Sequence, residues 1–245
     1  MKSIKIAKRF CGPPNSANGG YFAGCVSNLW TQTLTVRLFK PPPLETELQV
    51  AELPENLIEL RQGEELIAQG RPARLDLVPP QPPGYLEAVE ASRHYFGFER
   101  HAFPTCFVCG PARLRGEGLR IFAGPLARAD STDAQIFAAP WVADPGLDRG
   151  DGKVKPEFMT AALDCPGYAA VASGTVMLLG ELTAHVDRCV HIDEPCTVIA
   201  WPIESKGRRH ITGTAVFDED GELCARARAV WIEPANPERF TEPAA

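Results

Sequence analysis

The 245-residue chain contains no hydrophobic run long enough to cross a membrane. Its most apolar stretch is residues 167–182. This stretch is not continuously apolar, because it includes Ser173, Gly174, Thr175 and Gly180. A spanning helix needs about 20 consecutive, predominantly apolar residues. The N-terminal sequence MKSIKIAKRF also lacks the uninterrupted apolar core of a secretion signal. We therefore predict a cytoplasmic protein that is not embedded in a membrane.

An excess of positive charge is also lacking. Lysine and arginine number 25 against 31 aspartates and glutamates, which gives a net charge of −6. Nucleic-acid binding usually needs a basic face or stripe, so we expect no nucleic-acid partner. The chain has no G-x-S-x-G sequence, which argues against an α/β-hydrolase nucleophile elbow. It has no cofactor motif either, and we expect no cofactor. The eight cysteines are expected to be reduced thiols.

Proline marks the middle of the chain. Residues 75–84 (LDLVPPQPPG) contain four prolines, which fix their own φ angles and bias the preceding residues towards extended structure. We expect a stiff connector there, followed by a short amphipathic helix over residues 85–96. The predicted organisation is an N-terminal unit (1–78), a linker with the short helix (79–104), a C-terminal unit (105–236) and a tail (237–245).

The two halves repeat one order of elements: an extended segment, an apolar helix and several long strands. The predicted helices are 21–30 and 156–164. The predicted extended segments are 5–10, 33–40, 45–52, 57–61 and 65–77 in the first half, and 118–122, 134–139, 175–190, 197–203, 211–218 and 222–232 in the second. This pattern predicts an α+β fold of two duplicated units, each with a central helix wrapped by a curved antiparallel sheet. The units would pair sheet edge to sheet edge.

Three segments resemble one superfamily. They are PNSANGGYFA (14–23), TCFVCG (105–110) with GLRI (118–121), and PEFMTAALD (156–164). In this order they are similar to the hot-dog fold thioesterases of the acyl-CoA thioesterase superfamily, in a tandem (double hot-dog) arrangement over residues 4–78 and 105–234. The resemblance implies hydrolysis of an acyl-CoA or acyl-carrier thioester. It further implies a helix carboxylate acting as general base or nucleophile, backbone amides that polarise the carbonyl, and the possibility of a homo-oligomer.

Asp164 is the first candidate catalytic residue. No other charged residue lies within six positions on either side of it. Burying an unpaired carboxylate costs several kcal/mol, so this side chain needs a partner, a pocket or water. Facing a pocket, it could take a proton from a water that attacks a thioester. The alternative is that Asp164 only hydrogen-bonds the backbone near the bend that Pro166 imposes.

The other half would supply the electrophilic part of the site. Gly19 and Gly20 allow close approach at a helix N-terminus, whose amides carry partial positive charge, and the Gly20 amide is the predicted oxyanion donor. Asn15 and Asn18 could add side-chain donors. The alternative is that these residues only cap the helix and build turns.

Further site residues follow from the resemblance. In double hot-dog thioesterases the aspartate works with a Thr or Ser on the following strand and a Gln on the last strand. Thr183 is the counterpart of the Thr, but residues 223–232 contain no Gln. This departure leaves open a non-catalytic acyl-thioester-binding or structural protein on the same scaffold. The predicted substrate-binding residues are Asn15, Asn18, Gly19, Tyr21, Phe158 and Tyr168.

Cys106 and Cys109 form a lone C-x-x-C. A tetrahedral zinc site needs four ligands, and no second pair accompanies these two. His94 and His101 are near in sequence but lack a zinc-site spacing. We therefore predict a buried structural turn and no metal, with zinc binding and redox chemistry as the alternatives.

Overall fold

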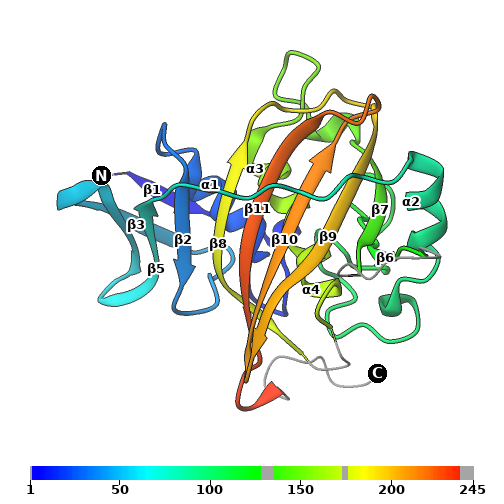
Figure 1. The fold of residues 1–245 in the computed structure, drawn as a ribbon. Coiled ribbons are helices and arrows are strands. Elements are labelled where there is room, and N and C mark those ends of the chain that lie inside the picture. The colour runs from blue at the N-terminus through cyan, green and yellow to red at the C-terminus, as the bar shows by residue number, and fades with distance from the viewer. Residues whose placement is uncertain (1, 128–134, 173–175, 238–245) are drawn as a thin grey trace.

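The computed structural model describes residues 2–127, 135–172 and 176–237. The eleven strands in these ranges form one antiparallel sheet in the order β1-β3-β4-β5-β2-β8-β11-β10-β9-β7-β6. Figure 1 shows that this sheet curves around helices α1, α3 and α4. The predicted α+β architecture, in which curved antiparallel sheet wraps central helices, is confirmed.

The two halves of the sheet have the same strand order. The first half consists of β1 (Ser3–Lys5), α1 (Gly19–Ser27), β2 (Leu34–Leu38), β3 (Glu47–Leu53), β4 (Leu57–Gln62) and β5 (Glu65–Pro72). The second consists of β7 (Phe137–Val142), α3 (Pro156–Ala162), α4 (Cys165–Ala169), β8 (Leu178–Val186), β9 (Pro195–Lys206), β10 (Arg209–Phe217) and β11 (Leu223–Ile232). The order β1-β3-β4-β5-β2 is matched by β7-β9-β10-β11-β8. This is the arrangement that a duplicated unit would produce.

The halves join at their edges through β2 and β8. Thr35 lies opposite Thr183 in this antiparallel pair, and Arg37 lies opposite Glu181. Each of these strands would otherwise expose a row of unpaired backbone groups. The sheet is therefore continuous across the halves, and the unit boundaries given above stay predictions.

Helix α1 is buried on most of its surface, as its uniformly apolar sequence indicates. Its buried residues include Tyr21, Phe22 and Val26. Gly24 lets α1 approach α3 closely, because a Cβ there would lie 2.7 Å from the Glu157 Cα. Asn28 also donates a hydrogen bond to the Glu157 carboxylate at 2.8 Å. The two central helices are thus packed directly against each other.

Two predicted strands are not observed as such. Of residues 5–10, Lys5 ends β1, and Lys8–Phe10 form a 3-10 helix. The chain leaves the sheet here because the Phe10 ring stacks on Tyr21, with ring centroids 4.1 Å apart. Residues 118–122 form no regular strand, but Leu119 and Ile121 donate backbone hydrogen bonds to residues 107 and 108. This pairing fixes the loop that carries Cys106 and Cys109.

The helix predicted over residues 156–164 is shorter and is followed by a second one. Helix α3 ends at Ala162, and α4 begins at Cys165. Proline in a helix interior clashes with the carbonyl four residues earlier, so Pro166 prevents a continuous helix through Ala162. Asp164 therefore adopts a non-helical conformation (φ −82°, ψ −83°) at the junction.

The connection between the halves crosses the outer face of the sheet, opposite the central helices, and leads to α2 (Tyr85–Ser92) (Figure 1). Leu77 in this connection packs against a core cluster that includes Trp201 and Phe217. The short strand β6 (Gly124–Pro125) pairs with β7. Within the described residues, no helix is both long and apolar enough to cross a membrane.

Candidate functional site

The Asp164 carboxylate lies against the N-terminus of α1. Its Oδ2 accepts a hydrogen bond from the Gly20 amide at 2.9 Å and one from Asn18 Nδ2 at 2.7 Å. Asn18 is the N-cap of α1, and its Oδ1 accepts the Tyr21 amide hydrogen at 2.8 Å. The fold thus brings a carboxylate of the later half to the helix N-terminus of the earlier half, as the sequence predicts.

Gly20 is required by the closeness of this contact. A Cβ atom at position 20 would lie 2.4 Å from the Asp164 Cβ and 3.1 Å from its Cγ. Carbon atoms normally approach to about 3.5–4.0 Å, so no larger residue fits without a shift of the helix or of Asp164.

The environment of Asp164 is unusual for a carboxylate. Only 3% of the residue is exposed. Burial raises the pKa of Asp164 to about 7, although the hydrogen bonds from Gly20 and Asn18 favour the ionised form. Its Oδ1 is buried and has no hydrogen-bond partner within the described parts of the chain. One oxygen is therefore held in place while the other remains able to accept a proton.

An apolar cleft lies beside the N-terminus of α1. It has a volume of about 290 Å³, and its lining includes Gly19, Leu38, Leu179 and Ile232. Asp164 is not part of the lining. The amide of Gly20 donates to Asp164, and the preceding residue, Gly19, is the first residue of α1 and lines the cleft. Amides at a helix N-terminus carry partial positive charge and suit a carbonyl oxygen or an anion.

Two predicted polar residues have other partners. Asn15 is exposed and adopts a left-handed conformation (φ 60°) in a turn in which the Ser16 amide donates to the Pro13 carbonyl. This is the turn role that asparagine often fills, and the prediction that Asn15 contributes a donor to the site is not supported. The hydroxyl of Thr183 lies 2.7 Å from that of Thr35, where the sheet halves meet. The geometry gives no hydrogen bond between Thr183 and Asp164.

The three aromatic residues predicted to contact substrate lie in packed surroundings. Tyr21 and Phe158 are buried and stack on each other across the α1–α3 contact, with ring centroids 5.5 Å apart. Tyr168 packs against Trp231 and Phe96. None of them lines the cleft described above. The fold uses these rings for core packing because both central helices meet there.

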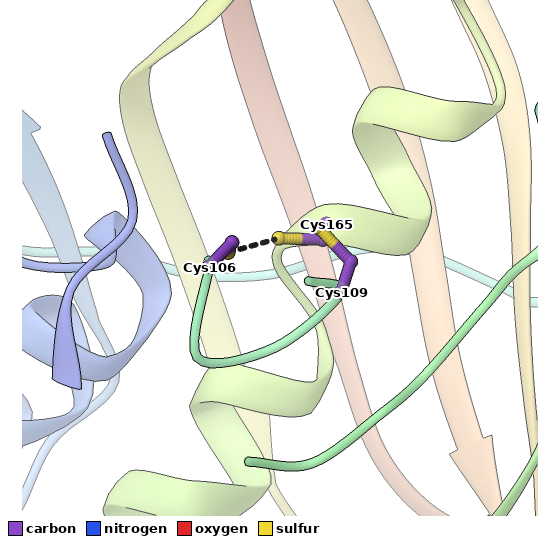
Figure 2. Close-up of side chains that lie close together, drawn as sticks. All are labelled: Cys106, Cys109 and Cys165. Carbon is purple, nitrogen blue, oxygen red and sulfur yellow. Dashed lines mark hydrogen bonds between the residues drawn. The ribbon is translucent and has the colours of Figure 1, made fainter. Parts of the chain in front are cut away.

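The sequence did not predict a cysteine cluster that lies beside Asp164. Cys106 and Cys109 lie in one loop, and Cys165 at the start of α4 points towards them (Figure 2). The sulfur atoms of Cys106 and Cys165 are 3.6 Å apart. Hydrogen bonds from Cys109 and Cys165 lower the pKa of the Cys106 thiol well below its ordinary value. The one sequence signal was the position of Cys165 next to Asp164, and only the fold brings it to the C-x-x-C.

Thr214 holds the α3–α4 junction in place. Its buried hydroxyl donates a hydrogen bond to the Leu163 carbonyl at 2.8 Å. Replacing Thr214 with valine keeps the shape and leaves that carbonyl without its donor. We expect the free energy of unfolding to fall by about 1–3 kcal/mol, measured by urea denaturation.

Thr46→Val is the control for this substitution. The Thr46 hydroxyl donates to the Leu44 carbonyl at 3.1 Å in a part-buried position, where water can replace it. Its loss should cost less than the loss at position 214. An equal or larger loss at position 46 would contradict the role assigned to Thr214.

Sequence comparisons find no relative: no family model matches the chain, and no curated protein does. Solved structures do match. A tesB protein of Mycobacterium avium subs paratuberculosis shares 11% identity over 95% of this chain and 92% of that one, with a TM-score of 0.59. An acyl-CoA thioesterase II of Mycobacterium marinum shares 15% identity over 96% and 93%, with a TM-score of 0.55.

A third structure is described by its fold. It is a protein of Alicyclobacillus acidocaldarius with a hot dog fold, 12% identical over 95% of this chain and 92% of that one, with a TM-score of 0.58. These similarities extend over nearly the whole length of each chain. Together with the repeated strand order, they show that the chain has the double hot-dog fold.

Proposed function

We propose that this double hot-dog protein is a thioesterase that hydrolyses an acyl-CoA or acyl-carrier thioester. The observation that carries the proposal is the contact between Asp164 and the N-terminus of α1, because it pairs a carboxylate with helix amide donors. The Gly20 amide lies 2.9 Å from Asp164 Oδ2, and Asp164 Oδ1 has no hydrogen-bond partner among the described residues. The thioesterases that share the fold support the same assignment.

In this mechanism the acyl chain occupies the apolar cleft, and the thioester carbonyl lies at the part of the cleft that Gly19 lines. The Gly19 amide donates to the carbonyl oxygen and stabilises the negative charge that develops there. Asp164 Oδ1 takes a proton from a water molecule whose oxygen attacks the carbonyl carbon. The carbon–sulfur bond then breaks, and the thiol leaves with the proton that Asp164 returns. Gly20 and Asn18 hold Oδ2 throughout and orient the carboxylate.

Direct attack by Asp164 is the other role that a carboxylate can play here. It would form a mixed anhydride with the acyl group, which water would then hydrolyse. A single turnover in ¹⁸O-labelled water detects the anhydride route when water attacks the Asp164 carboxyl carbon, because the label then enters Asp164 and the released acid is unlabelled. Direct attack by water on the thioester puts the label into the released acid and leaves Asp164 unlabelled.

The test of the proposal is a panel of acyl-CoA esters from acetyl to palmitoyl with the purified protein. Thiol release is followed with a thiol reagent against a blank without protein. We expect turnover above the blank for at least one ester, and longer chains should be favoured because the cleft lining is largely apolar. A panel without any thiol release would overturn the proposal.

The second candidate is a protein that binds acyl thioesters without hydrolysing them. It is favoured by the 3% exposure of Asp164, since a general base must be reached by water. Calorimetry with a non-hydrolysable acyl-CoA thioether distinguishes the two. Binding of the thioether together with no thiol release across the panel would support this candidate against the thioesterase.

The cleft makes chain-length selectivity testable. Ile232 lies at the end of β11, lines the cleft and is partly exposed, so a tryptophan there can fill the outer part of the cleft. Excluding two methylene groups costs about 1.6 kcal/mol. We expect Ile232→Trp to lower kcat/KM for a long-chain ester roughly tenfold and to leave acetyl-CoA hydrolysis unchanged. An equal loss on both esters would show that this cleft does not hold the acyl chain.

A further inference from the structure

Three cysteine sulfurs converge beside the candidate active site. The Sγ atoms of Cys106, Cys109 and Cys165 all lie within 4.8 Å of one another. Cys106 and Cys109 come from the loop before the second unit's strands, and Cys165 is the first residue of α4 (Figure 2). All eight cysteines lie in the described residues, and none forms a disulfide.

The Asn18 amide group, which donates to Asp164, also faces two of these sulfurs. Asn18 Nδ2 lies 3.9 Å from the sulfur of Cys106 and 3.7 Å from that of Cys165. Its partner oxygen, Oδ1, accepts the Tyr21 amide, which fixes Nδ2 as the group that faces the sulfurs. An N–H donor suits a thiolate better than a thiol, because the thiolate is the stronger acceptor.

His101 provides a donor to the third sulfur. Its Nδ1 accepts the Phe103 amide hydrogen at 2.9 Å, so a neutral ring carries its proton on Nε2. That atom lies 3.4 Å from the Cys109 sulfur and 2.9 Å from the Tyr95 hydroxyl. A ring fixed in this tautomer donates through Nε2 and is not a ligand there. Its Nε2 lies between the Tyr95 hydroxyl and the Cys109 sulfur, which is a suitable position for a group that orients a metal ligand from outside.

The geometry points to a metal site in which Cys106, Cys109 and Cys165 bind one soft divalent cation, Zn²⁺ in the first instance, as thiolates. Zinc–sulfur bonds of about 2.3 Å place the sulfurs of a tetrahedral site about 3.8 Å apart. The 3.6 Å between the sulfurs of Cys106 and Cys165 fits this spacing, and all three sulfurs lie within 4.8 Å of one another. A single disulfide would use only two of the three sulfurs, whereas a cation uses them all.

The site would tie the C-x-x-C loop to the first turn of α4. Because Cys165 follows Asp164 directly, the cation would fix the main chain that carries the candidate base. Three protein ligands leave a fourth position for water or another exogenous ligand. Binding would release the thiol protons to solvent. The cation is a different ligand from the thioester, and its binding does not depend on whether Asp164 hydrolyses a thioester.

The test uses the full-length protein, reduced, stripped with a chelator and titrated with Co²⁺. We expect one equivalent to bind, with thiolate-to-cobalt charge-transfer absorption and the visible bands of a tetrahedral ion. Added Zn²⁺ should displace these bands. Cys165→Ser should weaken Co²⁺ binding at least about tenfold and reduce the charge-transfer intensity, since even the loss of an outer partner costs 10–100-fold. Cys196→Ser, at another buried cysteine, should leave both unchanged.

A second measurement needs no variant. At a urea concentration that exposes the buried thiols of the metal-free protein, Zn²⁺ should slow the reaction of three of the eight thiols with a thiol reagent, and the chelator should remove this protection. A reduced wild-type protein that binds no Co²⁺, or protection of no additional thiols, would overturn the proposal. So would a spectrum that Cys165→Ser leaves unchanged. Recovery of a Cys106–Cys165 disulfide from protein that binds no metal would show a redox pair in its place.

Discussion

Replacing Asp164 by asparagine is expected to lower kcat for the best thioester by about 10²–10⁴-fold, the usual contribution of a general base. The side chains have the same shape. The asparagine oxygen can still accept the bonds that Gly20 and Asn18 now donate to Oδ2. The amide nitrogen then takes the place of Oδ1, which is the oxygen without a partner, and it cannot accept a proton from water. The fold should persist while the reaction is lost.

The control is Asp220→Asn, an exposed aspartate in the turn between β10 and β11. It should keep full activity. Circular dichroism and urea denaturation establish that both variants are folded. A folded Asp164→Asn protein with full thioester hydrolysis would show that Asp164 is not the base. Co²⁺ stoichiometry should stay at one in this variant, so failure of the catalytic assignment and failure of the metal site remain distinguishable.

The placement of Asp164 near the N-terminus of α1 could be predicted from two local signals, but its direct hydrogen bond with the Gly20 amide was not predicted. One is a single carboxylate in an apolar helix, which must find a partner, and the other is a glycine pair at a helix N-terminus. The two signals were assigned to one site because we expected the two units to supply opposite parts of it. The Gly20 amide, which was predicted to be the oxyanion donor, donates to Asp164 Oδ2, and the residue of α1 that lines the cleft is Gly19.

Thr183 shows where the sequence was insufficient. Its strand was predicted, but a strand pattern does not reveal which strand lies beside it in the sheet. The pairing of β8 with β2 sets Thr183 opposite Thr35 and joins their hydroxyl groups. The cysteine cluster could not be predicted for the same reason, because 56 positions separate Cys109 from Cys165. The bend at Pro166 and the backbone pairing at residues 107 and 108 bring the two cysteines together.

Gly20→Ala is expected to damage both stability and activity. In an unconstrained helix the change would stabilise by about 1 kcal/mol. Here the new Cβ would lie 2.4 Å from the Asp164 Cβ, so α1 or the α3–α4 junction must move by about 1 Å to reach normal contact. Overpacking of this kind costs about 1–3 kcal/mol. A displacement of about 1 Å in a catalytic group can lower kcat about 10²-fold. Urea denaturation and thiol release measure the two effects.

The matched control is Gly70→Ala, at another buried glycine. The three atoms nearest to a Cβ at position 70 would be side-chain carbons of Leu34, Ile58 and Val26, at 3.4–3.6 Å. These are near-normal contacts, so stability and kcat should change little. The comparison separates a general intolerance of buried glycines to substitution from the specific need at position 20. If Gly20→Ala matched Gly70→Ala in both measurements, the close approach of α1 to Asp164 would not be what orients the carboxylate, and Asn18 alone would have to hold it.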